Sequence, residues 1–240
     1  MTARSVVLSV LLGAHPAWAS AAELIRLTAD FDIRESTLRV ALTRMVGTGD
    51  LVRSADGYRL SDRLLARQRR QDEALAPRLR IWDGVWTTLV VTSVGIAARD
   101  RADLRKMLQD SRFGELREGV WLRPDNLGVE LGDEIHRWVR VLRSSDDAPV
   151  ELADQLWDLP GWSDTANRLL EEMAEMSKAA DVPGRFATAA AMVRHLLADP
   201  MLPDELLPHD WPGDRLRVAY QEFAAELGAR REHTELMEAK

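Results

Sequence analysis

The spacing of apolar residues changes close to residue 50, and this change constrains the fold more than any other feature. Before it, apolar residues recur at the period of an amphipathic helix in three short segments. After it, the segments 51–54 and 57–60 are joined by a turn that contains the pair Asp56-Gly57. This pair between two such segments is a strong indication of a β-hairpin. Three helices followed by a two-stranded hairpin predict a winged helix-turn-helix domain over residues 1–60.

The three predicted helices cover residues 3–13, 21–28 and 34–46. Ser20 and Glu23 have the spacing of a capping box at the start of the second helix. In the third helix, apolar residues at helical spacing define the face that we expect to be buried: Leu38, Ala41, Leu42 and Met45.

The first 21 residues also resemble a secretory signal peptide, with Arg4, an apolar run over 6–14 and small residues over 17–21. The alternative is that the apolar run forms the first helix of the domain. We favour the helix, because the roughly 40 residues that follow need it as a packing partner. The chain has no cysteine and no apolar run near the roughly 20 residues that cross a bilayer, so we expect a cytoplasmic protein.

Positive charge is concentrated at the start of the chain. The net charge is −7, but residues 1–80 contain 13 arginines, no lysine and 9 acidic residues, which gives +4. The remaining residues together carry −11. An acidic protein with one basic end concentrates phosphate affinity at that end. The alternative is an ordinary solvated surface with a chance asymmetry.

When the apolar face of helix 34–46 is turned inward, hydroxyl and guanidinium groups lie on its outer face. We predict that this face and the hairpin bind double-stranded DNA through Ser36, Thr37, Arg39, Val40, Thr43, Arg44, Arg53 and Arg59. Hydroxyl groups and arginines suit phosphates and guanine, and a valine suits the methyl group of thymine. The alternatives are solvated positions on an ordinary helix, or a winged helix that serves as a protein-interaction scaffold.

The rest of the chain predicts two further domains and therefore a multidomain α+β protein. A basic connecting helix over 61–82 leads to residues 83–145, which predict a ferredoxin-like α/β sandwich. Its expected strands cover 85–94, 119–122 and 139–143, and its expected helices cover 101–109 and 133–138. Residues 146–240 predict an all-helical C-terminal domain, with helices over 152–159, 164–180, 185–199 and 214–231 and a charged tail, 230–240, that we expect to fray.

Three stretches resemble the PaaX family, the repressors of phenylacetic acid catabolism genes. They are residues 36–46 with their Arg-Val-Ala-Leu core, the segment Trp82-Asp83-Gly84-Val85-Trp86, and the stretch 199–213, which is rich in proline and contains Trp211. The last stretch is the most specific, because no generic element produces its pattern. Arg34 departs from the small polar N-cap that the family commonly has, so we expect Asp32 or Glu35 to cap the third helix instead.

The resemblance implies a winged helix, a central domain related to small CRISPR-associated nucleases, and a helical C-terminal domain. It also implies a homodimer that represses transcription and leaves its operator when it binds an aryl-acyl-CoA such as phenylacetyl-CoA. Family members differ in the pathway they control, so the effector and its pocket are not assigned from the sequence.

A metal-dependent nuclease is the rival interpretation of the central domain. Its chemistry needs a carboxylate at the end of the first strand, and residues 86–94 contain no acidic residue. The five histidines have no metal-ligand spacing, so we expect no enzyme activity, no catalytic or metal-binding residue and no cofactor. Weak candidates for effector contacts are Arg185, Arg194 and His195, and five tryptophans that more often anchor a core: Trp121, Trp138, Trp157, Trp162 and Trp211.

Overall fold

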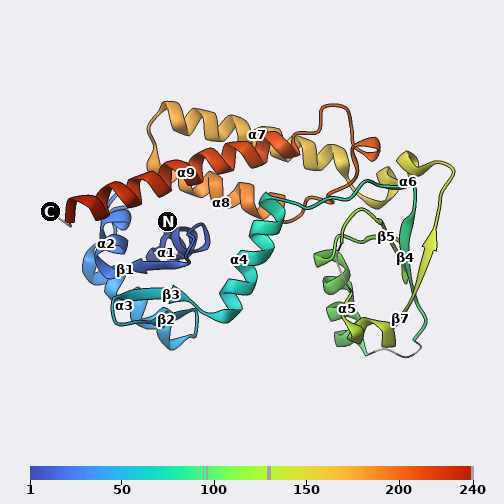
Figure 1. The fold of residues 1–240 in the computed structure, drawn as a ribbon, viewed down its shortest axis with the longest axis horizontal. Coiled ribbons are helices and arrows are strands. Elements are labelled where there is room, and N and C mark those ends of the chain that lie inside the picture. Colours follow the sequence, from blue (N-terminus) through green and yellow to red (C-terminus); the bar gives the residue numbers. More distant parts are fainter. Residues whose placement is uncertain (94, 96, 129–130, 239–240) are drawn as a thin grey trace. The chain divides into compact units, whose positions relative to one another are not determined.

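A computed structural model of the chain describes residues 1–93, 95, 97–128 and 131–238 (Figure 1). The chain forms two compact units, and neither unit is a continuous stretch of sequence. Unit 1 comprises residues 1–76, 166–197 and 214–240, and unit 2 comprises residues 77–165 and 198–213. The segment 146–240 therefore contributes residues to both units.

Unit 1 is mainly helical and contains one small sheet. Its elements are α1 (Ala3–Leu12), β1 (Trp18–Ser20), α2 (Ala21–Ala29), α3 (Glu35–Gly47), β2 (Leu51–Arg53), β3 (Gly57–Leu60), α4 (Asp62–Leu75), α8 (Val182–Leu196) and α9 (Gly213–Glu238). Helix α7 (Leu159–Lys178) begins in unit 2 and continues into unit 1. The three N-terminal helices and the hairpin lie within two residues of their predicted bounds. Ser20 caps α2 in a capping box with Glu23, as its spacing predicts.

Strand β1 is an element that the sequence analysis did not predict. It pairs antiparallel with β3, so that the sheet has the order β1-β3-β2. A strand of three residues is too short to show an alternating pattern. Ser20 is both the last residue of β1 and the N-cap of α2, so this strand fixes where the second helix begins.

The apolar run near the N-terminus forms the centre of the unit 1 core. Val6, Val7 and Leu11 of α1 are fully buried, because α2, α3, α4 and α8 all contact this helix. Phe186 of α8 belongs to the same core and meets Phe31 edge to face, with ring centroids 5.0 Å apart. Figure 1 shows α8 and α9, in orange and red, beside the blue N-terminal helices of this unit. Residues distant in sequence therefore share one core.

Gly57 has a different role from the one its Asp-Gly pair suggests. Its backbone is not among the positive-φ glycines, so no left-handed turn requires it. A Cβ atom at this position would lie 2.3 Å from the carbonyl oxygen of Ala19. The hairpin is confirmed, but this glycine serves the close approach of β1 to β3.

Unit 2 is built on a four-stranded antiparallel sheet. Its elements are β4 (Trp86–Val91), α5 (Ala98–Asp110), β5 (Gly114–Arg117), β6 (Val120–Pro124), a 3-10 helix η1 (Asp133–Arg137), β7 (Val139–Ser144), α6 (Pro149–Leu156) and a 3-10 helix η2 (Asp204–Leu206). The strand order β5-β6-β4-β7 is that of the predicted ferredoxin-like sandwich, with the second helix reduced to η1. Strand β5 is additional to the prediction. Strand β4 ends at Val91, and residue 94 of the predicted strand lies outside the described residues.

Alternating side chains of this sheet build one core on each face. Trp86 and Leu122 face α6 and the segment 202–211, whereas Leu89 and Trp121 face α5 and η1. The proline-rich stretch therefore covers one side of the sheet. In this part of the chain, Asn126 Nδ2 donates a hydrogen bond of 2.9 Å to the carbonyl oxygen of Met201.

The C-terminal helices differ from their predicted bounds at proline positions and at the end of the chain. Pro149 and Pro160 occupy the first turns of α6 and α7, where a missing N–H costs nothing, so both helices begin before the predicted residues. Helix α9 extends to Glu238 and so includes most of the charged tail 230–240, whereas residues 239–240 lie outside the described part. No helix within the described ranges is both long and apolar enough to cross a membrane.

Candidate nucleic-acid interface

Helix α3 turns its apolar residues into the core as predicted. Leu38, Leu42 and Met45 are almost fully buried, and Ala41 is half-buried. The N-cap is Arg34 and makes no side-chain capping hydrogen bond, so the expectation that Asp32 or Glu35 caps the helix is wrong. Asp32 instead adopts a positive φ of 54° in the turn before the helix. Within the described ranges, the first amides of α3 therefore have no side-chain cap.

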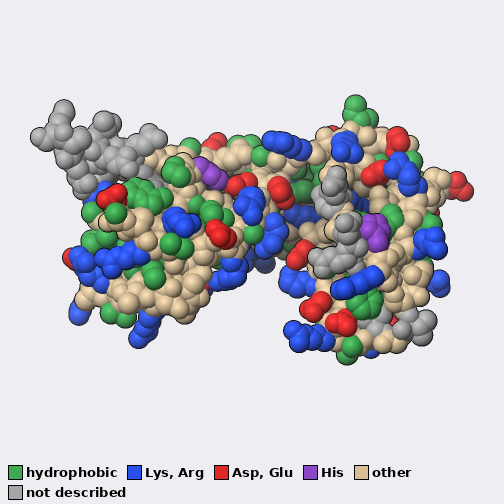
Figure 2. Space-filling view, turned by 60° about the horizontal axis from the view of Figure 1, so that its bottom comes forward, with side chains coloured by type: hydrophobic (Ala, Val, Ile, Leu, Met, Phe, Trp, Pro, Cys, Tyr) green, Lys and Arg blue, Asp and Glu red, His purple; other side chains and the backbone are tan. Residues whose placement is uncertain are grey.

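All eight residues predicted to bind DNA are exposed. The outer face of α3, which we call the reader face, consists of Ser36, Thr37, Arg39, Val40, Thr43 and Arg44. Figure 2 shows arginine side chains projecting from the part of the surface that carries α3 and the hairpin. Val40 is 51% exposed and therefore accessible to an apolar partner.

The arginines of this region differ in how they are held. Arg39 forms an i,i+4 ion pair with Glu35, with Nη2 2.6 Å from Oε1, and both side chains are more than half exposed. Such an exposed pair contributes about 0.3–0.5 kcal/mol, so a phosphate can replace the carboxylate at little cost. Arg44, Arg53 and Arg59 form no ion pair with any residue of the described ranges. These three guanidinium groups are therefore available to an anionic partner.

The two hairpin arginines do not share a face of the sheet. Arg59 lies opposite Val52 and Trp18, whereas Arg53 lies opposite Tyr58. Side chains alternate between the faces of a strand, so Arg53 and Arg59 project to opposite sides of the hairpin. One of them can lie along a neighbouring phosphate backbone while the other faces away.

A concavity of about 560 Å³ lies between the reader face and the N-terminus of α1. Ser36, Thr37, Val40 and Arg44 line it from α3, and Arg4 lines it from α1. The structure thus places four predicted residues around one depression. Arg4 was not among the predicted contacts, because its distance from α3 in the sequence gives no periodic signal.

Asp50 joins this surface to the rest of unit 1. Its carboxylate is 5% exposed and accepts hydrogen bonds from Arg4 Nη2, at 2.9 Å, and from Arg63 Nη2. Burial acts to raise the pKa of Asp50, but the hydrogen bonds and positive charges of Arg4 and Arg63 outweigh burial and hold this pKa below its ordinary value. The carboxylate connects the start of α1, the turn after α3 and the first turn of α4.

We expect Asp50→Asn to lower the free energy of unfolding by about 1–2 kcal/mol at neutral pH, because the charge-assisted hydrogen bonds that Asp50 accepts from the exposed side chains of Arg4 and Arg63 are lost. A carboxyl group whose pKa is lowered by folding contributes stability above its unfolded pKa and loses it as the pH falls through the folded pKa. The difference between wild type and variant should therefore be full above pH 3.8 and shrink below it. Urea unfolding at several pH values measures it. Asp56→Asn, in the exposed hairpin turn, is the control, and equal pH profiles for both variants would contradict the role of Asp50.

The residues considered for effector contacts lie in two different places. All five tryptophans belong to the packing of unit 2; Trp157 stacks on Trp86 and Trp162 stacks on Trp211, with ring centroids 6.4 Å and 4.3 Å apart. In unit 1, Arg185 pairs with Glu226 and lies over Phe223, whereas Arg194 lines a cavity beside α1. His195, the third weak candidate, is half-buried and does not line this cavity.

The central sheet presents no acidic residue along β4. At its end, Ser93 Oγ donates a hydrogen bond of 2.9 Å to the carbonyl oxygen of Arg137. Within the part of the chain that the structure describes, no three histidine, aspartate or glutamate side chains are grouped so that they could hold a metal ion.

Comparisons with known proteins agree along most of the chain. Three family models match: PaaX-like protein at residues 2–64, PaaX protein central Cas2-like domain at residues 79–147, and PaaX-like protein C-terminal domain at residues 151–235. The solved structure of Rv0674, an uncharacterized protein from Mycobacterium tuberculosis, is 67% identical, with a TM-score of 0.87 over 98% of this chain and 99% of that one. The transcriptional repressor PaaX of Escherichia coli (strain K12) is 26% identical over 210 residues, which span 76% of this chain and 66% of that repressor.

Basic N-terminal helices with a hairpin are followed by a Cas2-like sheet and by further helices. This order of elements defines the class of protein. The chain belongs to the PaaX-like protein family.

Proposed function

We propose that this protein is a DNA-binding transcriptional repressor, and that α1–α3 with the sheet β1-β3-β2 form a winged helix-turn-helix. The reader face carries the proposal, since it exposes two arginines, three hydroxyl groups and a valine on one side of a well-packed helix. The basic charge of residues 1–80 supports it. The similarity to a protein named as a transcriptional repressor supports it as well.

In this proposal α3 lies in the major groove and the β2–β3 hairpin lies along the flanking phosphate backbone. Arg44 is the best candidate for a guanine contact, because no carboxylate of the described residues holds it. Val40 would meet a thymine methyl group, and Ser36 and Thr37 at the start of the helix would reach phosphates or base edges.

A homodimer would place two such helices roughly 34–36 Å apart on a palindromic operator. The family resemblance suggests an acyl-CoA thioester, such as phenylacetyl-CoA, as the effector that releases the operator. Such an effector acts only if it binds a conformation with different helix spacing more tightly than the DNA-bound one.

We predict that the protein binds the DNA upstream of its own gene, and that Arg44→Ala weakens this binding by roughly 5- to 150-fold, the worth of a good arginine–guanine pair. Fluorescence anisotropy over a series of salt concentrations measures both the affinity and the number of phosphate contacts. Arg99→Ala, on the exposed surface of α5 in unit 2, is the matched control and should leave the affinity unchanged.

Two results would refute the proposal. One is binding that does not weaken as salt concentration rises. The other is an Arg39→Ala, Arg44→Ala double variant that binds as the wild type does, which would favour a protein-interaction scaffold. Divalent-metal-dependent cleavage of the DNA would instead establish a nuclease.

A further inference from the structure

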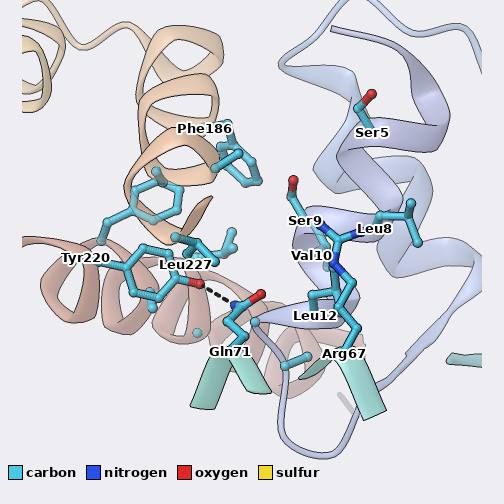
Figure 3. A pocket seen from close by; sticks show the side chains of 18 of the residues that line it. Ser5, Leu8, Ser9, Val10, Leu12, Arg67, Gln71, Phe186, Tyr220 and Leu227 are labelled. Carbon is cyan, nitrogen blue, oxygen red and sulfur yellow. Dashed lines mark hydrogen bonds between the residues drawn. The ribbon is translucent and has the colours of Figure 1, made fainter. Parts of the chain in front are cut away.

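A cavity of about 770 Å³ lies within unit 1 and is separate from the concavity beside α3 (Figure 3). Helices α1 and α4 form one side of it, and α8 and α9 form the other. Small-molecule sites in proteins have volumes of roughly 300–1,000 Å³, so this cavity is large enough for a ligand.

The walls combine apolar and polar side chains from segments that are far apart in the sequence. Among the lining residues are Leu8, Leu12, Phe186, Val193, Phe223 and Leu227. Figure 3 shows Phe186 and Leu227 on the side opposite Leu8 and Leu12. An aromatic ring or an acyl chain is the kind of group that such walls remove from water.

The charged groups of the lining all have the same sign. Arg4, Arg67 and Arg194 line the cavity, and no aspartate or glutamate is among its described lining residues. Arg4 is held by Asp50, but neither Arg67 nor Arg194 is paired with a carboxylate of the described ranges. In Figure 3 the guanidinium group of Arg67 lies beside Ser9 on the α1 side. In a chain of net charge −7, a cavity with two uncompensated arginines selects for an anion.

The cavity wall also offers a hydroxyl donor. Gln71 Nε2 donates a hydrogen bond of 3.1 Å to Tyr220 Oη, and both residues are buried. Burial, together with the negative charge of Asp72, raises the pKa of Tyr220 to about 12, although the hydrogen bond from Gln71 acts to lower it. The phenol is therefore neutral at physiological pH. Since its oxygen accepts from Gln71, its proton can be donated to a ligand oxygen.

We propose that this cavity binds an amphipathic organic anion. Its aryl or acyl group lies among Leu8, Phe186 and Val193, and its anionic group lies beside Arg67 and Arg194. The proposal of a binding site depends only on the observed cavity. The proposal that this site has a regulatory role rests on the proposed repressor function.

The regulatory role follows from the position of α1. This helix lines the cavity and also contacts α3, the helix that carries the reader face. Arg4 borders both the cavity and the concavity beside α3, and it holds Asp50 in the turn after that helix. A ligand that shifts α1 must therefore alter the setting of α3, so binding of the anion and of DNA are coupled. A coupling of roughly 5- to 150-fold in affinity is typical of such linked sites.

The test of the site uses 1-anilinonaphthalene-8-sulfonate, an aromatic sulfonate that fluoresces when it leaves water. Wild type should bind it saturably, and an Arg67→Gln, Arg194→Gln double variant should bind roughly tenfold more weakly or worse. Ala190→Trp, which adds a large side chain to the lining, should abolish the signal. Arg70→Gln is the matched control on α4, since Arg70 is exposed and does not line the cavity. Circular dichroism melts identify any variant that fails to fold.

Competition then defines the ligand. Octanoate and octanoyl-CoA should both displace the dye, and the tighter of the two tells whether the anion is a carboxylate or a CoA phosphate. Octylammonium should not displace it. Displacement by octylammonium as strong as by octanoate, or unchanged dye binding in folded double and Ala190→Trp variants, would overturn the site.

DNA-binding measurements on the same wild-type and variant proteins distinguish a failure of this inference from a failure of the proposed function. If DNA binding is salt-sensitive but unchanged by a saturating competitor, the regulatory role is refuted and the repressor function is not. If none of the proteins binds DNA while the variants lose the dye, the repressor function is refuted and the cavity remains a ligand site.

Discussion

Gly57→Ala is expected to lower the free energy of unfolding of unit 1 by about 3 kcal/mol or more, at the upper end of what overpacking costs. The new Cβ would lie 2.3 Å from the carbonyl oxygen of Ala19 and 3.0 Å from Ser20 Cα. Both atoms belong to the backbone of β1, so no side-chain rotation relieves the clash. The strand must move, and it takes the N-cap of α2 with it.

The measurement is thermal and urea unfolding followed by far-UV circular dichroism. Gly47→Ala is the matched control, because a Cβ at this exposed position in α3 meets nothing within 4 Å and the glycine has no positive φ. That substitution should be neutral or stabilising by about 0.4–1 kcal/mol. The close approach of β1 to β3 would be contradicted if the two variants unfolded alike.

Trp86→Ala should cost unit 2 about 3–5 kcal/mol, the range for a large aromatic side chain removed from a core. Trp86 is fully buried, meets Trp82 edge to face at 5.9 Å and stacks on Trp157. Its loss leaves a cavity between the sheet and the proline-rich segment, which relaxation can fill only in part. Trp86→Phe is the comparison, since it keeps the ring contacts and removes an indole N–H that is buried without an acceptor among the described residues.

Tryptophan fluorescence measures this effect selectively. Seven of the eight tryptophans lie in unit 2, and only Trp18 lies in unit 1. The fluorescence transition should therefore shift to lower urea in Trp86→Ala. A loss as small as that in Trp86→Phe would show that the ring does not carry the packing of this face.

The sequence predicts those parts of the fold that are governed by local periodicity. The reader face could be inferred because Leu38, Leu42 and Met45 repeat at helical spacing, which leaves the polar residues outside. Strand β1 and strand β5 could not, because three or four residues do not display an alternation, and their partners determine them. The hairpin was predicted from Asp56-Gly57, yet the glycine is required by a strand that the sequence did not reveal.

Long-range packing is the other part that the sequence could not supply. Arg4 and Asp50 are 46 residues apart, and their pairing depends on how α1 lies against α3. The cavity of unit 1 is an extreme case, since its lining combines residues from α1, α4, α8 and α9, which are far apart in the sequence. The sequence also could not predict that residues 146–240 are divided between the two units. A helical period gives no information on which core a helix joins.

The interrupted course of the chain has a consequence for biosynthesis. The chain passes between the units four times, and unit 1 is complete only when residues 214–240 have joined residues 1–76. On the ribosome, the reader helix can form early, but the contact between Phe31 and Phe186 must wait for α8. The contact between Phe186 and Phe223 must wait until α9 has left the exit tunnel. A nascent chain that lacks α8 and α9 therefore exposes part of the α1 core to solvent, so full stability of the candidate DNA-binding region is reached only after both helices have been synthesised.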